Sequence, residues 1–160
     1  MSVLPATTHI GHTHLRVSDL ERSLAFYCRA LGFAVTYRED EMVFLAAGAY
    51  HHHIAINIAT TKGAPPPPAG HTGLEHHAIV LPDRRSLVEA VRRLTAAGWP
   101  PCATVHHGVS DACYFTDPDG IGVELYVEEP RESWPRKADG TLAVHSTPMD
   151  LSELERPFAD

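Results

Sequence analysis

The feature that most constrains the fold of this chain is an internal repeat. Two segments share one pattern: residues 11–33, GHTHLRVSDLERSLAFYCRALGF, and residues 75–99, EHHAIVLPDRRSLVEAVRRLTAAGW. Each begins with a short histidine-led run typical of a strand, continues through an aspartate into an amphipathic helix, and ends in glycine followed by an aromatic residue. The repeat predicts two copies of one supersecondary unit, in which His12 corresponds to His76.

The helix in each copy is predicted by the spacing of its apolar residues. In the first copy they fall at i, i+4, i+7 and i+11, and in the second copy at i, i+4, i+7 and i+10, so each set is expected on one helix face. The two sets are Leu20, Leu24, Tyr27 and Leu31, and Leu87, Val91, Leu94 and Ala97. Ser18 and Glu21 fit a capping box, which predicts that the first helix begins at Ser18. Gly32 and Gly98 suit a left-handed residue at the helix end.

Strand-like runs follow each helix, so each half reads βαβββ. The runs are residues 34–38, 42–46 and 54–58 in the first half, and 104–106, 112–116 and 122–127 in the second. We therefore predict an α+β fold in which two βαβββ modules form an open, curved mixed sheet around a site. The expected single domain spans 1–160, with module 1 at about 9–60, a linker at 61–72, module 2 at about 73–128 and a tail at 129–160. Four consecutive prolines keep the linker extended, because they cannot donate ladder hydrogen bonds.

The composition excludes several classes of protein. A net charge of −7 argues against nucleic-acid binding. No run approaches the roughly 20 apolar residues of a membrane span, and the N-terminus lacks the pattern of a signal peptide. Three cysteines without metal-type spacing predict reduced, buried thiols. We expect a cytoplasmic globular protein that binds neither nucleic acid nor membrane.

Strand alternation predicts where the leading histidines point. Along residues 12–17, His12 lies opposite the face that carries the leucine and the valine. Along residues 76–81, His76 lies opposite the face that His77 shares with two apolar residues. The apolar faces should pack on the helices. If the two halves pair about a pseudo-twofold axis, the two imidazoles of His12 and His76 would meet in one cleft.

Glu124 is the candidate for a further ligand. It lies in VELY, an otherwise apolar strand that follows the DPDG turn at Asp117–Gly120. A carboxylate in such a strand is costly unless it is exposed, paired or bound to a metal. Two histidines and one carboxylate on one side of a metal form a facial triad, which leaves coordination positions open and is typical of non-haem Fe(II) enzymes that use O2.

These residues give the chain a family resemblance. The DLERSLAFY…LGF and DPDG…ELY motifs and the two βαβββ halves resemble the vicinal oxygen chelate superfamily of glyoxalases, bleomycin-resistance proteins and extradiol dioxygenases. The segments HGVSDACYFTDPDG and YHHHIAIN most resemble catechol 2,3-dioxygenase-type proteins. The resemblance covers nearly the whole chain. Many extradiol enzymes have four βαβββ units, whereas this chain has room for two, so a homodimer is expected to complete the enclosure of the substrate.

The resemblance implies roles for six residues. The metal ligands fall on His12, His76 and Glu124, the set that strand alternation also indicates. The histidine that assists oxygen activation matches His52, although strand parity leaves His53 open as the alternative. His107 matches the acid/base histidine of the family, and Tyr114 matches the tyrosine before the DPD turn.

The resemblance also implies a reaction and its rivals. The expected function is O2-dependent extradiol cleavage of a catechol-type aromatic diol, as in aromatic degradation, by an Fe(II)-dependent oxidoreductase. Mn²⁺, Zn²⁺ or Ni²⁺ are the other metals considered. One alternative is a glyoxalase-like lyase or isomerase, which would use four protein ligands and a redox-inert metal. Another is a drug-binding resistance protein on the same scaffold, which would need no metal.

Overall fold

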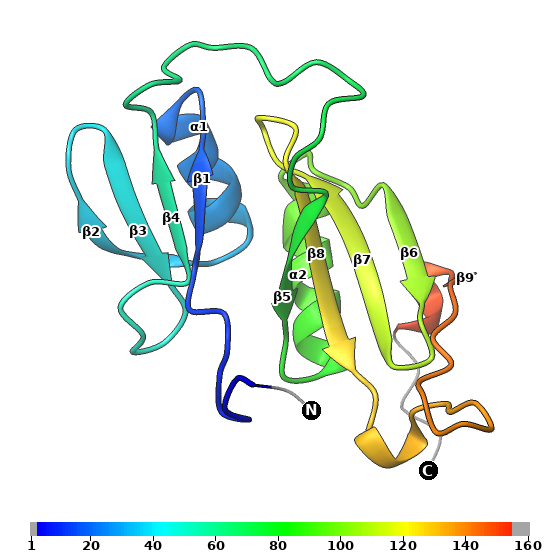
Figure 1. Ribbon diagram of the computed structural model, residues 1–160. Coiled ribbons are helices and arrows are strands. Elements are labelled where there is room, and N and C mark those ends of the chain that lie inside the picture. The colour runs from blue at the N-terminus through cyan, green and yellow to red at the C-terminus, as the bar shows by residue number, and fades with distance from the viewer. Residues whose placement is uncertain (1–2, 155–160) are drawn as a thin grey trace. The chain divides into compact units, whose positions relative to one another are not determined.

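The computed structural model describes residues 3–154. The chain divides into two compact units, residues 1–65 and residues 66–160, and the boundary falls inside the predicted proline-rich linker. Each unit contains one βαβββ module and one mixed sheet (Figure 1). The predicted α+β class and the two-module repeat are therefore confirmed.

The first unit contains a four-stranded sheet with the order β1-β4-β3-β2. β1 is parallel to β4, and the other neighbouring pairs are antiparallel. Its elements are β1 (Thr13–Arg16), α1 (Leu20–Leu24), the π-helical η1 (Ala25–Ala30) that continues α1, β2 (Ala34–Arg38), β3 (Met42–Ala46) and β4 (Ile54–Asn57).

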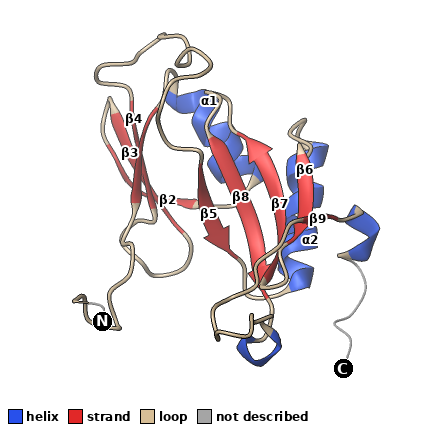
Figure 2. Cartoon of the chain, turned by 45° about the vertical axis from the view of Figure 1, so that its right-hand side comes forward, coloured by secondary structure: helices blue, strands red, loops and turns tan. Residues whose placement is uncertain are grey.

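The second unit repeats this topology and adds one strand. Its five-stranded sheet has the order β5-β8-β7-β6-β9, and β5 is parallel to β8 as β1 is to β4. α2 covers one face of this sheet, and the tail contributes β9 at its edge (Figure 2). The elements are β5 (His76–Val80), α2 (Arg84–Ala96), β6 (Ala103–His106), β7 (Ser110–Thr116), β8 (Gly122–Glu128), η2 (Arg131–Ser133), β9 (Thr147–Pro148) and η3 (Leu151–Glu153).

The two repeat aspartates cap the two helices. The Asp19 carboxylate accepts a hydrogen bond from the Arg22 backbone N–H at 2.9 Å, and the Asp83 carboxylate accepts one from Ser86 at 2.7 Å. Each satisfies one amide of the first turn that has no helical partner. The predicted capping box at Ser18 is therefore wrong by one residue, and the Ser18 hydroxyl instead accepts from the Arg22 guanidinium.

The core of the first unit lies between its helix and one face of its sheet. The helix face predicted from the sequence is buried at Leu20, Leu24, Tyr27 and Leu31. In η1 the Leu31 amide donates to the Phe26 carbonyl at 2.9 Å, an i→i−5 bond that widens the turn. The wide turn lets the adjacent Phe26 and Tyr27 both become fully buried. Gly32 then ends the helix at φ 107°, as predicted.

The second core lies between α2 and β8. Leu87, Val91 and Leu94 are buried as predicted, and β8 contributes Val123 and Leu125. Ala97 is exposed, so its placement on the buried face is wrong: α2 ends at Ala96, and Ala97 is the C-cap residue.

Shortening Leu94 tests this core. Leu94 has no exposed surface, so Leu94→Ala removes buried methyl groups and leaves a cavity. We expect a loss of about 2–5 kcal/mol in the free energy of unfolding, measured by urea denaturation. The control, Thr95→Ala, changes an exposed residue of the same helix and should change this free energy by less than about 0.5 kcal/mol. Equal effects of the two variants would contradict the packing described.

Two further predictions concern the cysteines and membranes. Cys113 is buried as expected, but Cys102 is exposed because it precedes β6 and does not lie on the core face of a strand. Within residues 3–154, no helix combines the length and the apolar character that crossing a membrane requires.

Candidate functional site

The outer face of β1 carries exposed histidines. Leu15 and Val17 are buried against the core, whereas His12 and His14 are exposed, so the predicted alternation is confirmed. His14 Nε2 lies 2.6 Å from the Asn57 amide nitrogen on the neighbouring β4. This bond fixes the His14 ring along the sheet.

His52 lies beside His12 in the first unit. Their ring centroids are 4.5 Å apart, and His52 stacks on Phe44 at 4.2 Å. His51 Nδ1 and His52 Nδ1 are 2.7 Å apart, so one ring donates and the other accepts. Of the two histidines that strand parity left open, His52 is the one that contacts His12.

His53 occupies a different environment. Its ring packs against Tyr50 at 4.7 Å, and its Nδ1 accepts a hydrogen bond from the Ala47 backbone N–H at 3.3 Å.

Partial burial, and then the nearby imidazoles of His12 and His51, lower the pKa of His52. At neutral pH His52 is therefore a neutral imidazole, which can act as a hydrogen-bond donor through one nitrogen.

His76 and Glu124 meet in the second unit. The His76 Nε2 atom lies 3.0 Å from Glu124 Oε2, and the two side chains are 34% and 12% exposed. In the parallel pair of β5 and β8, Glu124 lies opposite Ala78, two residues beyond His76, so both side chains share the outer face of the sheet. His77 points the other way and is buried. Burial, followed by the neighbouring His76, lowers the pKa of His77 to about 4.

The geometry of this pair suits a divalent cation. Two ligand atoms bound to one cation at right angles, with bonds of about 2.1 Å, lie about 3 Å apart. The 3.0 Å separation of His76 Nε2 and Glu124 Oε2 is a hydrogen-bond distance, and it is also compatible with that spacing. One imidazole nitrogen and one carboxylate oxygen are also donor types that Fe(II), Mn²⁺, Zn²⁺ and Ni²⁺ accept.

Gly122 lets β5 and β8 approach closely at this pair. Gly122 lies directly opposite His76, and a Cβ added at position 122 would lie 2.9 Å from the His76 Cβ and would collide with the Glu75 carbonyl oxygen. Glycine is therefore required by this close approach of two strands.

The Gly122→Ala variant tests that requirement. The added methyl group should push the His76 backbone away from β8. On the predicted role of His76 as a metal ligand, this should weaken Fe(II) binding about 10–100-fold, the range seen when groups that orient metal ligands are removed. Anaerobic Fe(II) titration measures the change. Gly73→Ala is the control, because an added Cβ there meets no atom within 4 Å. Unchanged Fe(II) affinity in Gly122→Ala would contradict the role assigned to the glycine.

Tyr114 and His107 extend the His76–Glu124 pair into a hydrogen-bonded string. Tyr114 lies opposite Glu124 in the antiparallel pair of β7 and β8, and its hydroxyl donates to Glu124 Oε1 at 3.0 Å. His107 Nε2 lies 2.8 Å from the same hydroxyl. Burial, and then the hydrogen bond to Glu124, raise the pKa of Tyr114 to about 12. The phenol therefore keeps its proton at neutral pH.

The number of available hydrogens limits which bonds of this string can form at the same time. The Tyr114 hydroxyl has one hydrogen, so it can donate to Glu124 or to His107 but not to both at once. While it donates to Glu124, the bond to His107 uses a hydrogen on Nε2, and when it donates to His107, Nε2 is the acceptor. Nε2 of His107 can therefore be the donor or the acceptor in this bond, according to which neighbour the Tyr114 hydrogen faces. The arrangement can thus move a proton over the outer face of the sheet, next to Glu124.

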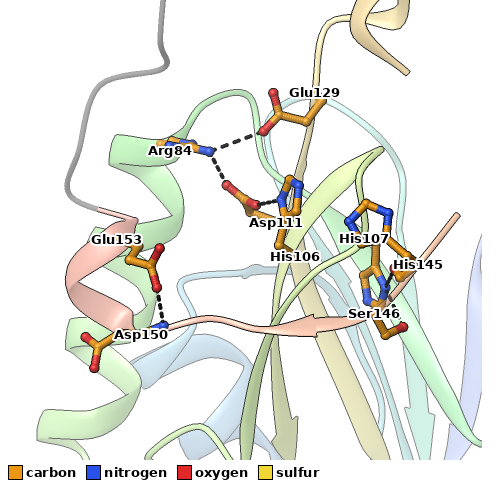
Figure 3. Close-up of polar contacts among 9 residues, drawn as sticks. All are labelled: Arg84, His106, His107, Asp111, Glu129, His145, Ser146, Asp150 and Glu153. Carbon is orange, nitrogen blue, oxygen red and sulfur yellow. Dashed lines mark hydrogen bonds and ion pairs between the residues drawn. The ribbon is translucent and has the colours of Figure 1, made fainter. Parts of the chain in front are cut away.

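A second polar cluster in this unit was missed by the sequence analysis (Figure 3). His106 Nδ1 donates to Asp111 Oδ1 at 2.7 Å, and the Arg84 guanidinium bonds both Asp111 and Glu129. Asp111 is 1% exposed. Strand alternation in the sequence could have indicated the buried carboxylate, because Asp111 lies on the core-facing side of β7 with Cys113 and Phe115.

The two carboxylates of this cluster are paired with a guanidinium. The donor atoms of His106, Asp111 and Glu129 lie within 4.8 Å of one another, which is the one such grouping in the part of the chain that the structure describes. The guanidinium of Arg84 already supplies the cation that the two carboxylates require. The cluster therefore fixes the first turn of α2 to the start of β7.

The structure thus brings the candidate residues together in two groups. His12 and His52 are neighbours in the first unit, and His76, Glu124, Tyr114 and His107 form one string in the second. Whether His12 joins the His76–Glu124 pair on one metal stays a prediction.

The sequence matches the Glyoxalase/Bleomycin resistance protein/Dioxygenase superfamily over residues 9–125. It is 37% identical over its whole length to a catechol-2,3-dioxygenase of Bacillus subtilis (strain 168), of which it covers 55%. It is 31% identical to biphenyl-2,3-diol 1,2-dioxygenase 3 of Rhodococcus globerulus, over 81% of this chain and 70% of that protein. A probable lactoylglutathione lyase of a Synechocystis species is 28% identical over 71% of this chain and 91% of its own length. The chain therefore spans about half the length of the Bacillus relative.

Solved structures show the same fold at lower identity. A glyoxylase/bleomycin resistance protein/dioxygenase domain from Frankia sp. EAN1pec aligns with a TM-score of 0.64 and 18% identity, over 79% of this chain and 96% of that one. A glyoxalase/dioxygenase from Nostoc punctiforme aligns with a TM-score of 0.63 and 17% identity, over 81% and 98%. At this identity the likeness concerns the fold alone.

Proposed function

Because the chain belongs to the glyoxalase/bleomycin resistance protein/dioxygenase superfamily, we propose that it is a metal-dependent extradiol dioxygenase that cleaves a catechol-type aromatic diol with O2. The observation that carries the proposal is the string of His76, Glu124, Tyr114 and His107, which joins a metal-type donor pair to an acid/base pair. The relatives named as catechol and biphenyl-diol dioxygenases support the substrate class.

The proposed metal ligands are His12, His76 and Glu124. The His76–Glu124 pair has the donor atoms and the spacing for one cation, and His12 would complete a set of two histidines and one carboxylate. Fe(II) is the metal proposed, because this set leaves positions open for substrate and O2. When bound, the metal would orient the diol and O2 and lower the pKa of the diol hydroxyls.

Tyr114 and His107 would handle the protons of the diol. In its neutral form His107 would accept a proton at Nε2, and the Tyr114 hydroxyl next to it would turn its one hydrogen from Glu124 to a substrate oxygen. The raised pKa of Tyr114 keeps it a donor throughout the neutral range. In the first unit, His52 would donate a hydrogen bond toward developing negative charge, since its lowered pKa makes it a neutral donor.

The second candidate is a lyase of the glyoxalase kind. It is favoured by one observation, the match to lactoylglutathione lyases of Synechocystis and Escherichia coli O157:H7. Both candidates need a metal, but they differ in whether O2 is consumed.

A homodimer in the cytoplasm is part of the proposal, and light scattering of the purified protein tests the dimer.

The function is tested by oxygen uptake after anaerobic reconstitution with Fe(II). We expect uptake of O2 with catechol or a 3-substituted catechol, together with the yellow colour of the ring-fission product. The same preparation with Zn²⁺ in place of Fe(II) is the control and should consume no O2. No uptake across the catechol panel, combined with turnover of the methylglyoxal–glutathione adduct in the Zn²⁺ or Ni²⁺ form, would establish the lyase instead.

A further inference from the structure

The C-terminal tail lies against the loop that carries His107. β9 pairs with β6 in the antiparallel register His106↔Thr147, and the His145 backbone N–H donates to the His107 carbonyl at 3.3 Å. The Met149 N–H donates to the Thr104 carbonyl at 3.1 Å. Backbone pairing thus holds residues 147–149 of the tail to β6, and His145 to His107 itself.

The tail also bonds the His107 ring itself. His107 Nδ1 lies 3.1 Å from the His145 carbonyl oxygen and 3.1 Å from the Ser146 hydroxyl oxygen (Figure 3). A carbonyl oxygen accepts hydrogen bonds and cannot donate them, so the bond requires a hydrogen on Nδ1. The requirement holds whether the ring is neutral or protonated.

Gly108 leaves the space in which the tail packs against the His107 loop. Its φ of +77° lies in the region that favours glycine, and a Cβ there would lie 2.5 Å from His145 Cε1 and 3.0 Å from Pro135 Cγ. The His145 ring also contacts the ring of His106, at a centroid distance of 5.5 Å. His106 is in turn held by the buried carboxylate of Asp111. The contact between tail and loop therefore rests on a rigid part of the unit.

From this geometry we infer that the His145–Ser146 segment of the tail is a positioning element that holds His107 in the Nδ1–H form, so that His107 exchanges protons only at Nε2. That nitrogen lies 2.8 Å from the Tyr114 hydroxyl. The choice of tautomer by the partner of the second ring nitrogen is a general property of histidine. The catalytic benefit of this positioning rests on the proposed function, whereas the tautomer itself does not.

The tautomer is measured by nitrogen NMR of the metal-free protein. A two-bond ¹H–¹⁵N imidazole spectrum at about pH 9, above the ordinary imidazole pKa, distinguishes a protonated Nδ1 from a protonated Nε2. His107→Gln identifies the His107 signals by their loss. We expect Nδ1 to be protonated in the wild-type protein, opposite to the preference of a solvated imidazole. A protonated Nε2 in the wild-type protein would overturn the inference.

Variants of the 160-residue chain connect the tautomer to turnover. His145→Gly/Ser146→Gly removes the hydroxyl and loosens the backbone that presents the carbonyl. This variant should show a mixture of tautomers and a kcat about 10–100-fold lower, the range for groups that orient a working side chain, with little change in KM or in Fe(II) content. Ser146→Thr keeps the hydroxyl and should behave as wild type, and Ser152→Gly is the control further along the tail.

The outcomes separate the two proposals. A single Nδ1–H tautomer in His145→Gly/Ser146→Gly would overturn the inference, because the tail would not be what selects it. An Nδ1–H tautomer in the wild type and a mixture in the variant would support the inference even if no O2 were consumed. Absence of O2 uptake would then count against the proposed function alone.

Discussion

Replacing Glu124 by glutamine is expected to lower kcat/KM for the catechol by more than about 100-fold and to lower Fe(II) retention with it. Loss of groups that only orient metal ligands costs about 10–100-fold. Glu124 is proposed to be a charged ligand itself, so its loss should cost more. The substitution keeps the size of the side chain. It also keeps an acceptor for the Tyr114 hydroxyl, which now bonds Glu124 Oε1 at 3.0 Å.

The matched control for this substitution is Glu128→Gln. Glu128 lies on the same strand with the same parity but is exposed, and it pairs with Ser110 at the far end of β8. It should retain Fe(II) and turnover at the wild-type level. Oxygen-electrode kinetics and iron analysis of the desalted proteins provide both readouts. A Glu124→Gln protein that binds iron and turns over like Glu128→Gln would show that Glu124 is not a ligand.

Replacing His107 by glutamine should lower kcat by about 10²–10⁴-fold, the usual contribution of a general acid or base. Glutamine keeps a polar group near the Tyr114 hydroxyl but cannot exchange a proton at neutral pH. Iron content should stay at the wild-type level, because His107 reaches the donor pair only through Tyr114. The effect therefore differs in kind from that of Glu124→Gln, which removes metal and turnover together.

The control for His107 is His71→Gln, which changes an exposed histidine of the linker. Single-turnover measurements under anaerobic loading with substrate, followed by mixing with O2, separate the chemical step from metal binding. A His107→Gln protein with wild-type kcat would remove His107 from the mechanism. A loss of iron in that protein would instead assign His107 to the metal site.

Much of the fold follows from local spacing. The apolar residues at i, i+4, i+7 and i+11 predict the first helix, and Leu20, Leu24, Tyr27 and Leu31 are all buried. Alternation along β1 and β5 likewise predicts which histidines leave the core. The capping-box pattern predicts the cap of α1 at Ser18, one residue before the observed cap Asp19. Asp19 and Asp83 correspond in the two copies, and both are caps.

The site was less accessible to sequence reasoning, for physical reasons. Parity puts His76 and Glu124 on one face, but their 3.0 Å contact depends on the register of β5 against β8 and on the close approach at Gly122. The Arg84–Asp111 ion pair joins the start of α2 to the start of β7, and no local sequence pattern predicts such a contact. The contact of the tail with His107 joins residues far apart in the sequence, through backbone groups that every residue carries.

The ligand set of His12, His76 and Glu124 is tested most directly by X-ray absorption spectroscopy of the anaerobic Fe(II) protein. The proposal predicts one iron per chain with two imidazole ligands and additional oxygen donors, and a single imidazole in His12→Ala. His14→Ala, which removes the next exposed histidine of β1, should give the wild-type spectrum. Iron with two imidazole ligands in His12→Ala, or no iron bound by the wild-type protein, would contradict it.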